Sequence, residues 1–279
     1  MLYLIATPIG NLKDITLRAL EVLKEVDTIA CEDTRVSLKL LSHYGISKPL
    51  LSYHEHGMSS RLLPLLREGK KVAYITDGGM PLISDPGFKL IAACQAENIP
   101  HTVIPGASAP LMALCLSGLS SARFTFCGFL PPKKGARQTA LEGLRGLPTT
   151  LIFFESPKRL TAFLKDAREV LGDRQGAVCR EMTKLFESVE RGPLSSLEEH
   201  YTATPARGEV VVVIEGVTET LAPSEDDIAK HLQKALETYS VKEAASLVAQ
   251  ALGVPKREVY HHALNLKAKT TSLPEGSES

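Results

Sequence analysis

Short apolar runs alternate with segments of helical periodicity through the first part of the chain. The runs are rich in β-branched residues and read LYLIA (2–6), TIAC (28–31), LLSY (50–53), VAYIT (72–76) and HTVI (101–104). Continuous apolar runs separated by helical segments are typical of parallel strands joined by crossover helices. The pattern therefore predicts an α/β domain over residues 1–118.

A second series of strand-like runs follows this domain. Its members cover residues 124–129, 151–154, 177–180, 187–192 and 209–216. Fewer helical patterns separate the later members, which favours a mixed sheet over an all-parallel one. We therefore expect a second α/β domain over residues 119–218.

The pattern becomes purely helical from Pro223 onward. A first helix ends at Gly253, and a second begins after Pro255. The predicted inward positions are Ala244, Ala245, Leu247, Val248 and Ala251 on the first helix, then Val259, Tyr260, Ala263 and Leu264 on the second. This spacing predicts a helix-turn-helix-like unit over residues 223–269 and a disordered tail over 270–279.

The second helix of this unit also carries basic residues on its outward face. Lys256 and Arg257 are suited to phosphate contacts there. A helical hairpin used only for packing or dimerisation explains the same pattern equally well.

Length and composition agree with this division. At about 150 residues per domain, 279 residues suffice for two domains and a small appendage. No apolar run reaches the roughly 18 residues of a membrane span, and the start lacks the basic region of a signal peptide. We therefore expect a cytoplasmic protein without membrane contact.

Charge and cysteine usage narrow the classes of partner. The 32 basic and 32 acidic residues give zero formal net charge, so a nucleic-acid partner would need local basic patches. One such patch is PPKKGAR, with Lys133 and Lys134. The five cysteines never form a CxxC pair, which predicts buried thiols rather than disulfides or a metal site.

Polar and glycine-rich segments follow each predicted strand of the first domain. They read TPIGN (7–11), EDTR (32–35), HEH (54–56), DGGMPLISDPG (77–87) and PGASA (105–109). Ligands of open α/β sheets bind at the carboxyl ends of the strands, although each segment taken singly also fits ordinary turn chemistry.

Two aspartates in the fourth segment have different expected roles. Asp85 precedes Pro86 and a helical pattern, which predicts the N-cap of that helix. Asp77 stands at the strand end beside Gly78 and Gly79, where a backbone without side chains can approach a ligand. Ser108 fits both a helix cap and an anion site.

Several common chemistries lack their sequence signature. GxGxxG, GxxxxGK[ST] and GxSxG are absent, which argues against a dinucleotide fold, a P-loop and an α/β-hydrolase. His54 and His56 have the spacing of a strand-borne metal pair, but the sequence offers no convincing third ligand. We therefore expect no metal.

Taken together and in order, these segments resemble one family. TPIGNL, CEDTR, SDPG, PGASA, GFLP, FFES, REMTK and GEVVVVIEG are similar to the RsmI family of 16S rRNA (cytidine-2'-O-)-methyltransferases, within the tetrapyrrole methylase fold. The resemblance covers about residues 2–217, and the helical unit resembles the family's C-terminal one. It implies S-adenosylmethionine bound between two α/β domains, a homodimer, no metal, and 16S rRNA in the small ribosomal subunit as partner.

The resemblance also implies which residues contact the cofactor. They are Pro8, Ile9, Asp77, Gly79, Met80, Pro81, Ile83, Ser108, Ala109, Phe154, Glu181 and Glu209. The family pattern reads DAGTPLISDPG, so Gly78 and Met80 replace an alanine and a threonine. A cofactor contact from that threonine hydroxyl would be lost in this chain.

Methyl transfer to a ribose 2'-hydroxyl requires alignment of that hydroxyl and removal of its proton. Glu32, Asp33 and His56 are the candidate bases, although Asp33 fits a helix cap equally well. The candidate RNA-binding residues are Arg35, Lys133, Lys134, Lys184, Lys256 and Arg257. The alternatives are a tetrapyrrole C-methyltransferase of the same fold and a ligand-sensing DNA-binding regulator.

Overall fold

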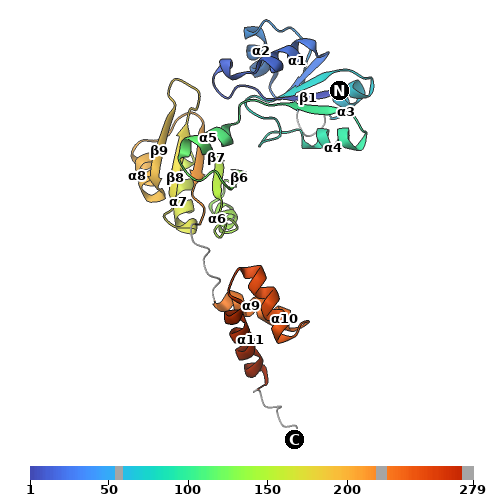
Figure 1. Ribbon diagram of the computed structural model, residues 1–279. Coiled ribbons are helices and arrows are strands. Elements are labelled where there is room, and N and C mark those ends of the chain that lie inside the picture. The colour runs from blue at the N-terminus through green and yellow to red at the C-terminus, as the bar shows by residue number, and fades with distance from the viewer. Residues whose placement is uncertain (54–58, 218–224, 272–279) are drawn as a thin grey trace. The chain divides into compact units, whose positions relative to one another are not determined.

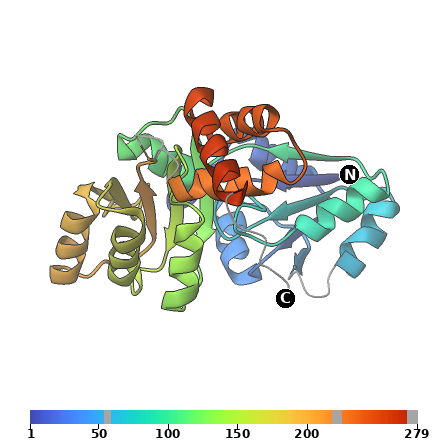
Figure 2. The ribbon, with the colours of Figure 1, turned by 90° about the horizontal axis from the view of Figure 1, so that it is seen from below.

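The computed structural model describes residues 1–53, 59–217 and 225–271. The chain separates into two compact units, Met1–Gly216 (unit 1) and Val217–Ser279 (unit 2) (Figure 1). Unit 1 contains two β-sheets that lie side by side, each with its own helices (Figure 1 and Figure 2).

The first sheet of unit 1 is parallel, as predicted, and has the strand order β3-β2-β4-β1-β5 in the described part of the chain. Its strands are β1 (Leu2–Ile5), β2 (Thr28–Cys31), β3 (Leu50–Ser52), β4 (Val72–Ile75) and β5 (His101–Ile104). Helices α1 (Leu17–Glu25) and α2 (Thr34–His43) cover one face, and α3 (Ser59–Arg67) and α4 (Phe88–Ala96) cover the other. A short 3₁₀ helix, η1 (Leu12–Asp14), precedes α1.

Helices cover both faces of this sheet, and successive side chains of each strand point to opposite faces. Leu4 and Tyr74 pack with the helices on one face, whereas Ile5 and Ala73 pack on the other. The continuous apolar runs seen in the sequence follow from this double burial.

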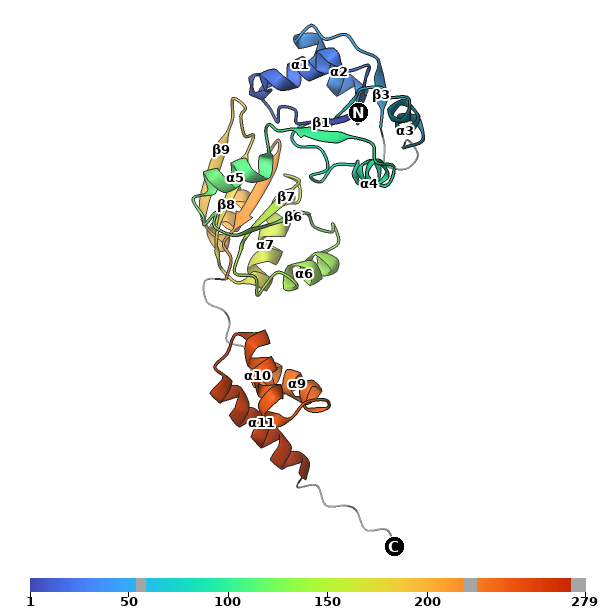
Figure 3. The same cartoon turned by 45° about the vertical axis from the view of Figure 1, so that its right-hand side comes forward.

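The second sheet is mixed, which confirms the prediction from its runs. Its order is β6-β7-β10-β8-β9; β6 and β7 are parallel, and the other neighbouring pairs are antiparallel. The strands are β6 (Phe124–Phe129), β7 (Thr150–Glu155), β8 (Gln175–Arg180), β9 (Ser188–Pro193) and β10 (Val210–Ile214). On one face lie α6 (Lys134–Glu142), α7 (Leu160–Leu171) and α8 (Leu194–Ala203) (Figure 3).

Helix α5 (Ala109–Ser117) covers the other face of the second sheet. Its residues Ala113 and Leu114 pack with Ile152, Ala177 and Val213. This helix therefore belongs by sequence to the first predicted domain and by packing to the second sheet. The division of unit 1 at residue 118 stays a prediction.

Unit 2 is a helical bundle of α9 (Glu225–Leu236), α10 (Val241–Leu252) and α11 (Lys256–Thr271). Ser240 and Glu243 form a capping box at the start of α10, and Gly253 ends it with a φ of 65°. The core holds Ile228, Leu232, Ala244, Ala245, Val248, Ala249, Val259 and Ala263.

Four of the residues predicted to face the core of unit 2 are exposed instead. Leu247, Tyr260 and Leu264 are 45%, 38% and 43% exposed, and Ala251 is exposed as well. Helix α9 supplies Ile228 and Leu232 to the same core. With a third helix filling part of the core, α10 and α11 each bury fewer residues than the prediction assumed.

The five cysteines, which all lie among the described residues, are free thiols. Cys31, Cys94 and Cys179 are buried as predicted, whereas Cys115 is exposed. None of the helices in the described ranges is both long and apolar enough to cross a membrane.

Candidate active site

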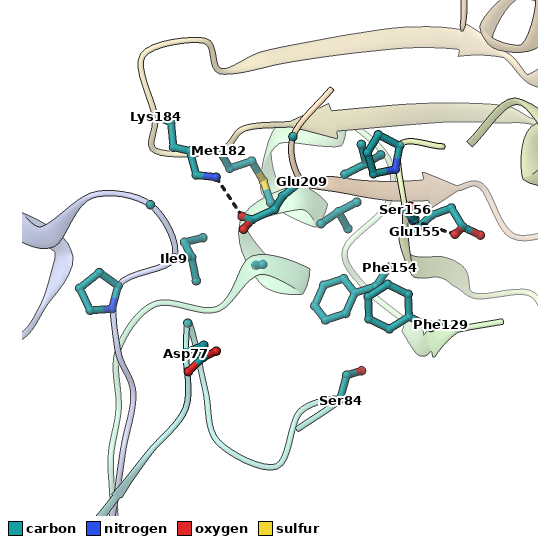
Figure 4. Close-up of a pocket in the computed structure, with 18 of the residues that line it drawn as sticks. Ile9, Asp77, Ser84, Phe129, Phe154, Glu155, Ser156, Met182, Lys184 and Glu209 are labelled. Carbon is teal, nitrogen blue, oxygen red and sulfur yellow. Dashed lines mark hydrogen bonds and ion pairs between the residues drawn. The ribbon is translucent and has the colours of Figure 1, made fainter. Parts of the chain in front are cut away.

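A cavity of about 700 Å³ lies in unit 1 between the two sheets (Figure 4). Its first wall comes from the loops after β1 and β4 and from the start of α5, and its second wall comes from the second sheet. The lining residues are Pro8, Ile9, Gly10, Leu12, Asp77, Gly78, Ser84, Asp85, Ala109, Phe129, Phe154, Glu155, Ser156, Pro157, Met182, Lys184, Gly208, Glu209, Val210 and Val211.

Backbone contacts hold the two loops of the first wall together. Thr7 and Gly79 exchange backbone hydrogen bonds of 2.9 and 3.0 Å, and the Thr7 hydroxyl donates to the carbonyl of Thr76 at 3.1 Å. The loops meet because β1 and β4 are neighbours in a parallel sheet, so their carboxyl ends lie at the same edge.

Gly10 is the point where the first wall touches the second. A Cβ atom on Gly10 would lie 2.7 Å from Lys184 Cγ and Thr183 Oγ1, and 2.9 Å from the carbonyl oxygen of Met182. Gly78 is less crowded, since its Cβ would lie 3.4 Å from the carbonyl oxygen of Pro8. Of these two positions, Gly10 has no room for a side chain, whereas Gly78 could accommodate a methyl group.

The loop after β4 has a constrained backbone. Leu82 and Ser84 have φ values of 75° and 65°, which residues other than glycine rarely adopt. Such conformations persist only where the surrounding structure imposes them, and they occur often at ligand sites.

Asp85 is not the N-cap of α4, contrary to the prediction. The helix begins at Phe88, after Gly87 with a φ of 128°, and a Cβ on Gly87 would lie 2.6 Å from Leu82 Cδ2. The packing of Leu82 thus requires glycine at the cap, and Asp85 lines the cavity instead. Burial raises the pKa of the Asp85 carboxyl.

Asp33 caps α2, as one of its two predicted roles requires. Its Oδ1 accepts from the backbone N–H of Arg35 at 2.8 Å, and the Arg35 guanidinium donates to both carboxylate oxygens at 3.1 and 2.7 Å. The hydrogen bonds from Arg35 lower the pKa of Asp33 to about 2. The backbone N–H of Asp33 donates to Oδ1 of Asp77, which lines the cavity, at 3.2 Å.

Aromatic rings form the centre of the second wall. The centroid of the Phe154 ring lies 5.0 Å from that of Phe126 and 5.4 Å from that of Phe129. Phe129 is nevertheless 59% exposed. In Figure 4, the rings of Phe129 and Phe154 lie across the cavity from Ile9 and Asp77.

Two arginine side chains hold the chain segment that follows Phe129 by hydrogen bonds to its backbone carbonyls, and each arginine is paired with a buried carboxylate. The Arg159 guanidinium donates to the carbonyl of Leu130 at 2.9 Å, and its Nε lies 3.3 Å from Glu155 Oε1. The Arg137 guanidinium donates to the carbonyl of Pro132 at 3.2 Å and to Asp166 Oδ2 at 2.7 Å.

Glu155 is the carboxylate partner of Arg159. Its side chain is fully buried, and burial raises the pKa of the carboxyl. The Ser156 backbone N–H donates to its Oε1 at 2.7 Å.

An ion cluster borders the upper part of the cavity in Figure 4. Lys184 Nζ donates to Glu181 Oε1 at 2.9 Å and to Glu209 Oε2 at 3.1 Å, and the Glu209 backbone N–H donates to Glu181 at 2.9 Å. That backbone bond and Lys184 lower the pKa of Glu181. Burial lowers the pKa of Lys184, but its hydrogen bonds to Glu181 and Glu209 outweigh this and raise it overall. Gly208 permits the cluster, since its Cβ would lie 2.2 Å from Glu181 Oε1.

The residues expected to contact a cofactor divide into two groups. Pro8, Ile9, Asp77, Ala109, Phe154 and Glu209 line the cavity. The others lie outside its lining, as far as the described residues form it: Gly79, Met80, Pro81, Ile83, Ser108 and Glu181. Gly79 pairs with Thr7, and Ser108 precedes α5 without a capping hydrogen bond from its side chain to any described residue.

The residues expected to act as bases or to hold RNA lie mostly apart from the cavity. Lys184 lines it, whereas Glu32, Asp33, Arg35, Lys133 and Lys134 are not among its described lining residues. Lys134 Nζ lies 3.8 Å from Asp166 and 3.5 Å from Glu169, so its charge is partly paired. Lys256 and Arg257 are exposed in unit 2, and His56 lies outside the described residues.

Sequence reasoning did not select several lining residues as site residues. They are Gly10, Leu12, Ser84, Asp85, Phe129, Glu155, Ser156, Pro157, Met182, Gly208, Val210 and Val211. Val210 and Val211 reach the cavity because β10 is antiparallel to β7, so its start lies beside the end of β7. The segments GFLP, FFES and REMTK did contain some of these residues, but strand order decides which of them face the cavity. Within the described ranges, no group of three His, Cys, Asp or Glu side chains has the geometry of a metal site.

Comparison with known proteins gives two family matches. The family of tetrapyrrole (corrin/porphyrin) methylases matches residues 1–198, and the RsmI C-terminal HTH domain matches residues 222–267.

Two curated relatives are each called ribosomal RNA small subunit methyltransferase I. The relative from Mesorhizobium japonicum is 48% identical over 272 residues, which cover 95% of this chain and 92% of the relative. The relative from Thermotoga maritima is 46% identical over 218 residues, which cover 77% of this chain and 98% of the relative. The second match thus spans nearly the whole of a shorter protein.

A solved structure shows the same fold at lower sequence identity. Uroporphyrin-III-C-methyltransferase from Thermus thermophilus aligns with a TM-score of 0.57 and 21% identity, covering 77% of this chain and 93% of that one. The predicted fold, with its parallel and mixed sheets, is thereby confirmed.

Proposed function

Since this chain belongs to the tetrapyrrole methylase family, and its relatives include ribosomal RNA small subunit methyltransferases, we propose that it methylates 16S rRNA. The methyl donor is S-adenosylmethionine. The acceptor we propose is the ribose 2'-hydroxyl of a cytidine in the small ribosomal subunit. The observation that carries the proposal is the match to a named rRNA methyltransferase over 95% of the chain.

The cavity has the size and chemistry that S-adenosylmethionine requires. Its volume of about 700 Å³ falls within the range of roughly 300–1,000 Å³ that is usual for small-molecule sites. Phe154, Met182 and Val211 offer apolar surface for an adenine ring. The Glu209 carboxylate, 76% exposed, can accept hydrogen bonds from ribose hydroxyls.

The start of α5 suits the carboxylate of the methionine moiety. Ala109 lines the cavity at the first turn, and the backbone N–H groups there receive no capping bond from the Ser108 side chain. Such groups together with the helix dipole favour an anion. We propose that the cofactor occupies the part of the cavity bounded by Ile9, Ala109 and Glu209.

The bound sulfonium supplies an electrophilic methyl carbon with a neutral leaving group. The protein must therefore orient the 2'-hydroxyl and accept its proton. Asp33 suits the second task poorly, because Arg35 occupies both carboxylate oxygens and holds the pKa of Asp33 at about 2. We propose that Glu32 or His56 accepts the proton. Full activity in both Glu32→Gln and His56→Ala enzymes would refute this assignment.

RNA contacts outside the cavity would come from Arg35, Lys133 and the exposed start of α11. We propose that unit 2 has an accessory role in RNA binding, because its exposed Lys256 and Arg257 lie outside the unit that holds the cavity. Removing residues 217–279 should weaken binding to the small subunit and reduce its salt dependence, because phosphate contacts are lost. Cofactor affinity should stay unchanged, because the cavity belongs to unit 1.

One experiment tests the proposed function directly. The enzyme is incubated with radiolabelled S-adenosylmethionine and, separately, with 30S subunits, free 16S rRNA, a porphyrinogen or duplex DNA. We expect label in a cytidine ribose of the 30S subunit. Label in the porphyrinogen, or in a nucleobase rather than ribose, would contradict the proposal.

We also propose that the protein is a homodimer in the cytoplasm. Leu17, Leu185 and Phe186 are 79%, 89% and 69% exposed, and we propose that a homodimer covers them. Light scattering should then give twice the chain mass of 30.2 kDa. We propose a cytoplasmic location, because the proposed substrate is part of the ribosome.

A further inference from the structure

Part of the cavity is not needed by the cofactor placement proposed above. This outer part is bounded by Phe129 from the second sheet and by Ser84 and Asp85 from the loop after β4. Figure 4 shows Ser84 and the Phe129 ring on the side of the cavity away from Lys184. An apolar ring and a carboxyl group therefore border the same space.

The end of β6 and the loop after β4 meet closely at this place. A bulge interrupts the pairing of β6 with β7 between Phe126 and Gly128, and Gly128 has a φ of 62°. A Cβ on Gly128 would lie 3.1 Å from Ser84 Oγ. The two chain segments that present Phe129 and Asp85 are thus in direct contact, although one comes from each half of unit 1.

The Phe129 ring is exposed and held in place, so a flat ligand group can stack on it. One side of the ring packs against Phe154, yet 59% of the residue remains exposed. The segment behind it is held by Arg159 and Arg137 through the carbonyls of residues 130 and 132. A fixed and exposed aromatic ring is a stacking surface for an unpaired nucleobase.

Asp85 adds a carboxyl group to the lining of the same cavity. A carboxylate accepts hydrogen bonds from the exocyclic amine of cytosine, whereas uracil presents a carbonyl oxygen at the same position. A carboxylate beside the stacked base would therefore favour cytosine.

We propose that Phe129 and Asp85 form the subsite for the target base: the ring stacks on the base, and the carboxyl group accepts a hydrogen bond from its exocyclic amine. This inference rests on the proposed function, because it requires a nucleotide acceptor. It assigns the choice of base to a residue whose sequence pattern indicated only a helix cap.

The stacking role is tested with Phe129→Leu, which keeps an apolar side chain but removes the ring. With 30S subunits and saturating S-adenosylmethionine, kcat/KM should fall by at least about fivefold, since the stacking of a base on an aromatic ring stabilises the complex. Phe129→Trp should retain most activity. Phe124→Leu is the matched control, because Phe124 begins the same strand, is 42% exposed and lies away from the described cavity lining.

The base preference is tested with Asp85→Ala and with subunits whose target cytidine is replaced by uridine. The wild-type enzyme should prefer the cytidine subunit, and Asp85→Ala should reduce that preference about tenfold while its cofactor Kd stays unchanged. An unaltered preference would overturn the role of Asp85.

The outcomes separate this inference from the proposed function. If the wild-type enzyme labels no rRNA, the proposed function fails. If it labels 30S subunits and Phe129→Leu has unchanged kcat/KM, only the subsite is wrong. A Phe129→Leu enzyme with a weakened cofactor Kd would place the ring in the cofactor site and would also overturn the inference.

Discussion

The two walls of the cavity are built in different ways. The wall from the first sheet is mainly backbone: two strand-end loops joined through Thr7 and Gly79, with Gly10 and Gly78 at its surface. The wall from the second sheet is mainly side chain, with Phe129 and Phe154 backed by buried ion pairs. The first wall therefore depends on shape, and the second depends on the side chains that hold its rings in place.

This difference determines which substitutions each wall tolerates. A backbone wall is damaged when a side chain is added where none fits, because close-packed structure has no free volume. A side-chain wall is damaged when a buried partner is removed, because the other partner is left unpaired. Four substitutions examine the contrast, beginning with the largest expected effect.

Asp166→Ala should have the largest effect on stability. It leaves the Arg137 guanidinium buried without its carboxylate, and removing one partner of a buried ion pair costs about 3–5 kcal/mol. Urea unfolding measures the loss. Glu169→Ala is the control, since Glu169 also pairs with Lys134 but is 38% exposed and should cost under about 1 kcal/mol. Equal losses in the two proteins would mean that the buried pair does not support the second wall.

Gly10→Ala should damage the first wall through overlap with Lys184, Thr183 and the Met182 carbonyl. Overpacking of this kind costs roughly 1–3 kcal/mol, so we expect a cofactor Kd at least about fivefold weaker by calorimetry. Gly78→Ala should bind nearly as wild type, because its Cβ would have an ordinary contact distance of 3.4 Å. The reverse order of the two affinities would contradict the close contact at Gly10.

Glu181→Gln should have a smaller effect that depends on pH. The folded-state pKa of Glu181 lies below its ordinary value of 4.5, so its ion pair stabilises the protein above that pH. The contribution is lost as pH falls through the lowered pKa. We expect wild type to exceed the variant by about 1 kcal/mol at pH 7, and we expect this difference to shrink as pH falls below 4.5. A constant difference across this range would exclude the ion pair as its source.

Asp85→Asn should have the smallest effect, with the opposite sign. Burial raises the pKa of Asp85, so the folded state loses stability as pH rises and the carboxyl ionises. The variant should therefore have a slightly higher Tm than wild type at pH 7, and the two should coincide near pH 3. A lower Tm at pH 7 would show that the carboxylate stabilises the fold.

The sequence predicted the strands well because short runs rich in apolar, β-branched and aromatic residues mark them. The predicted runs at 28–31, 101–104 and 124–129 coincide with β2, β5 and β6. Asp33 was also foreseen as a helix cap, since capping depends on a few neighbouring residues.

Features that depend on distant contacts were not predicted. The Asp85-Pro86 pattern resembles a helix start, but contact between Leu82 and Gly87 moves the start to Phe88. Phe129 faces the cavity because of a bulge and the neighbouring loop after β4, and neither is visible in a single segment. Tyr260 and Leu264 fit an inward stripe by their spacing, but α9 supplies Ile228 and Leu232 to the core and both residues remain exposed.

The cavity draws its lining from Pro8 to Val211, almost the full length of unit 1, and from the ends of both of its sheets. A ligand that binds across both sheets stabilises only molecules in which both are folded. Calorimetry should therefore show a single sharper transition for unit 1 when S-adenosylmethionine is present, with the calorimetric and van't Hoff enthalpies converging. During synthesis, cofactor binding becomes possible only after residue 211 has left the ribosome, so occupancy reports a completed unit 1.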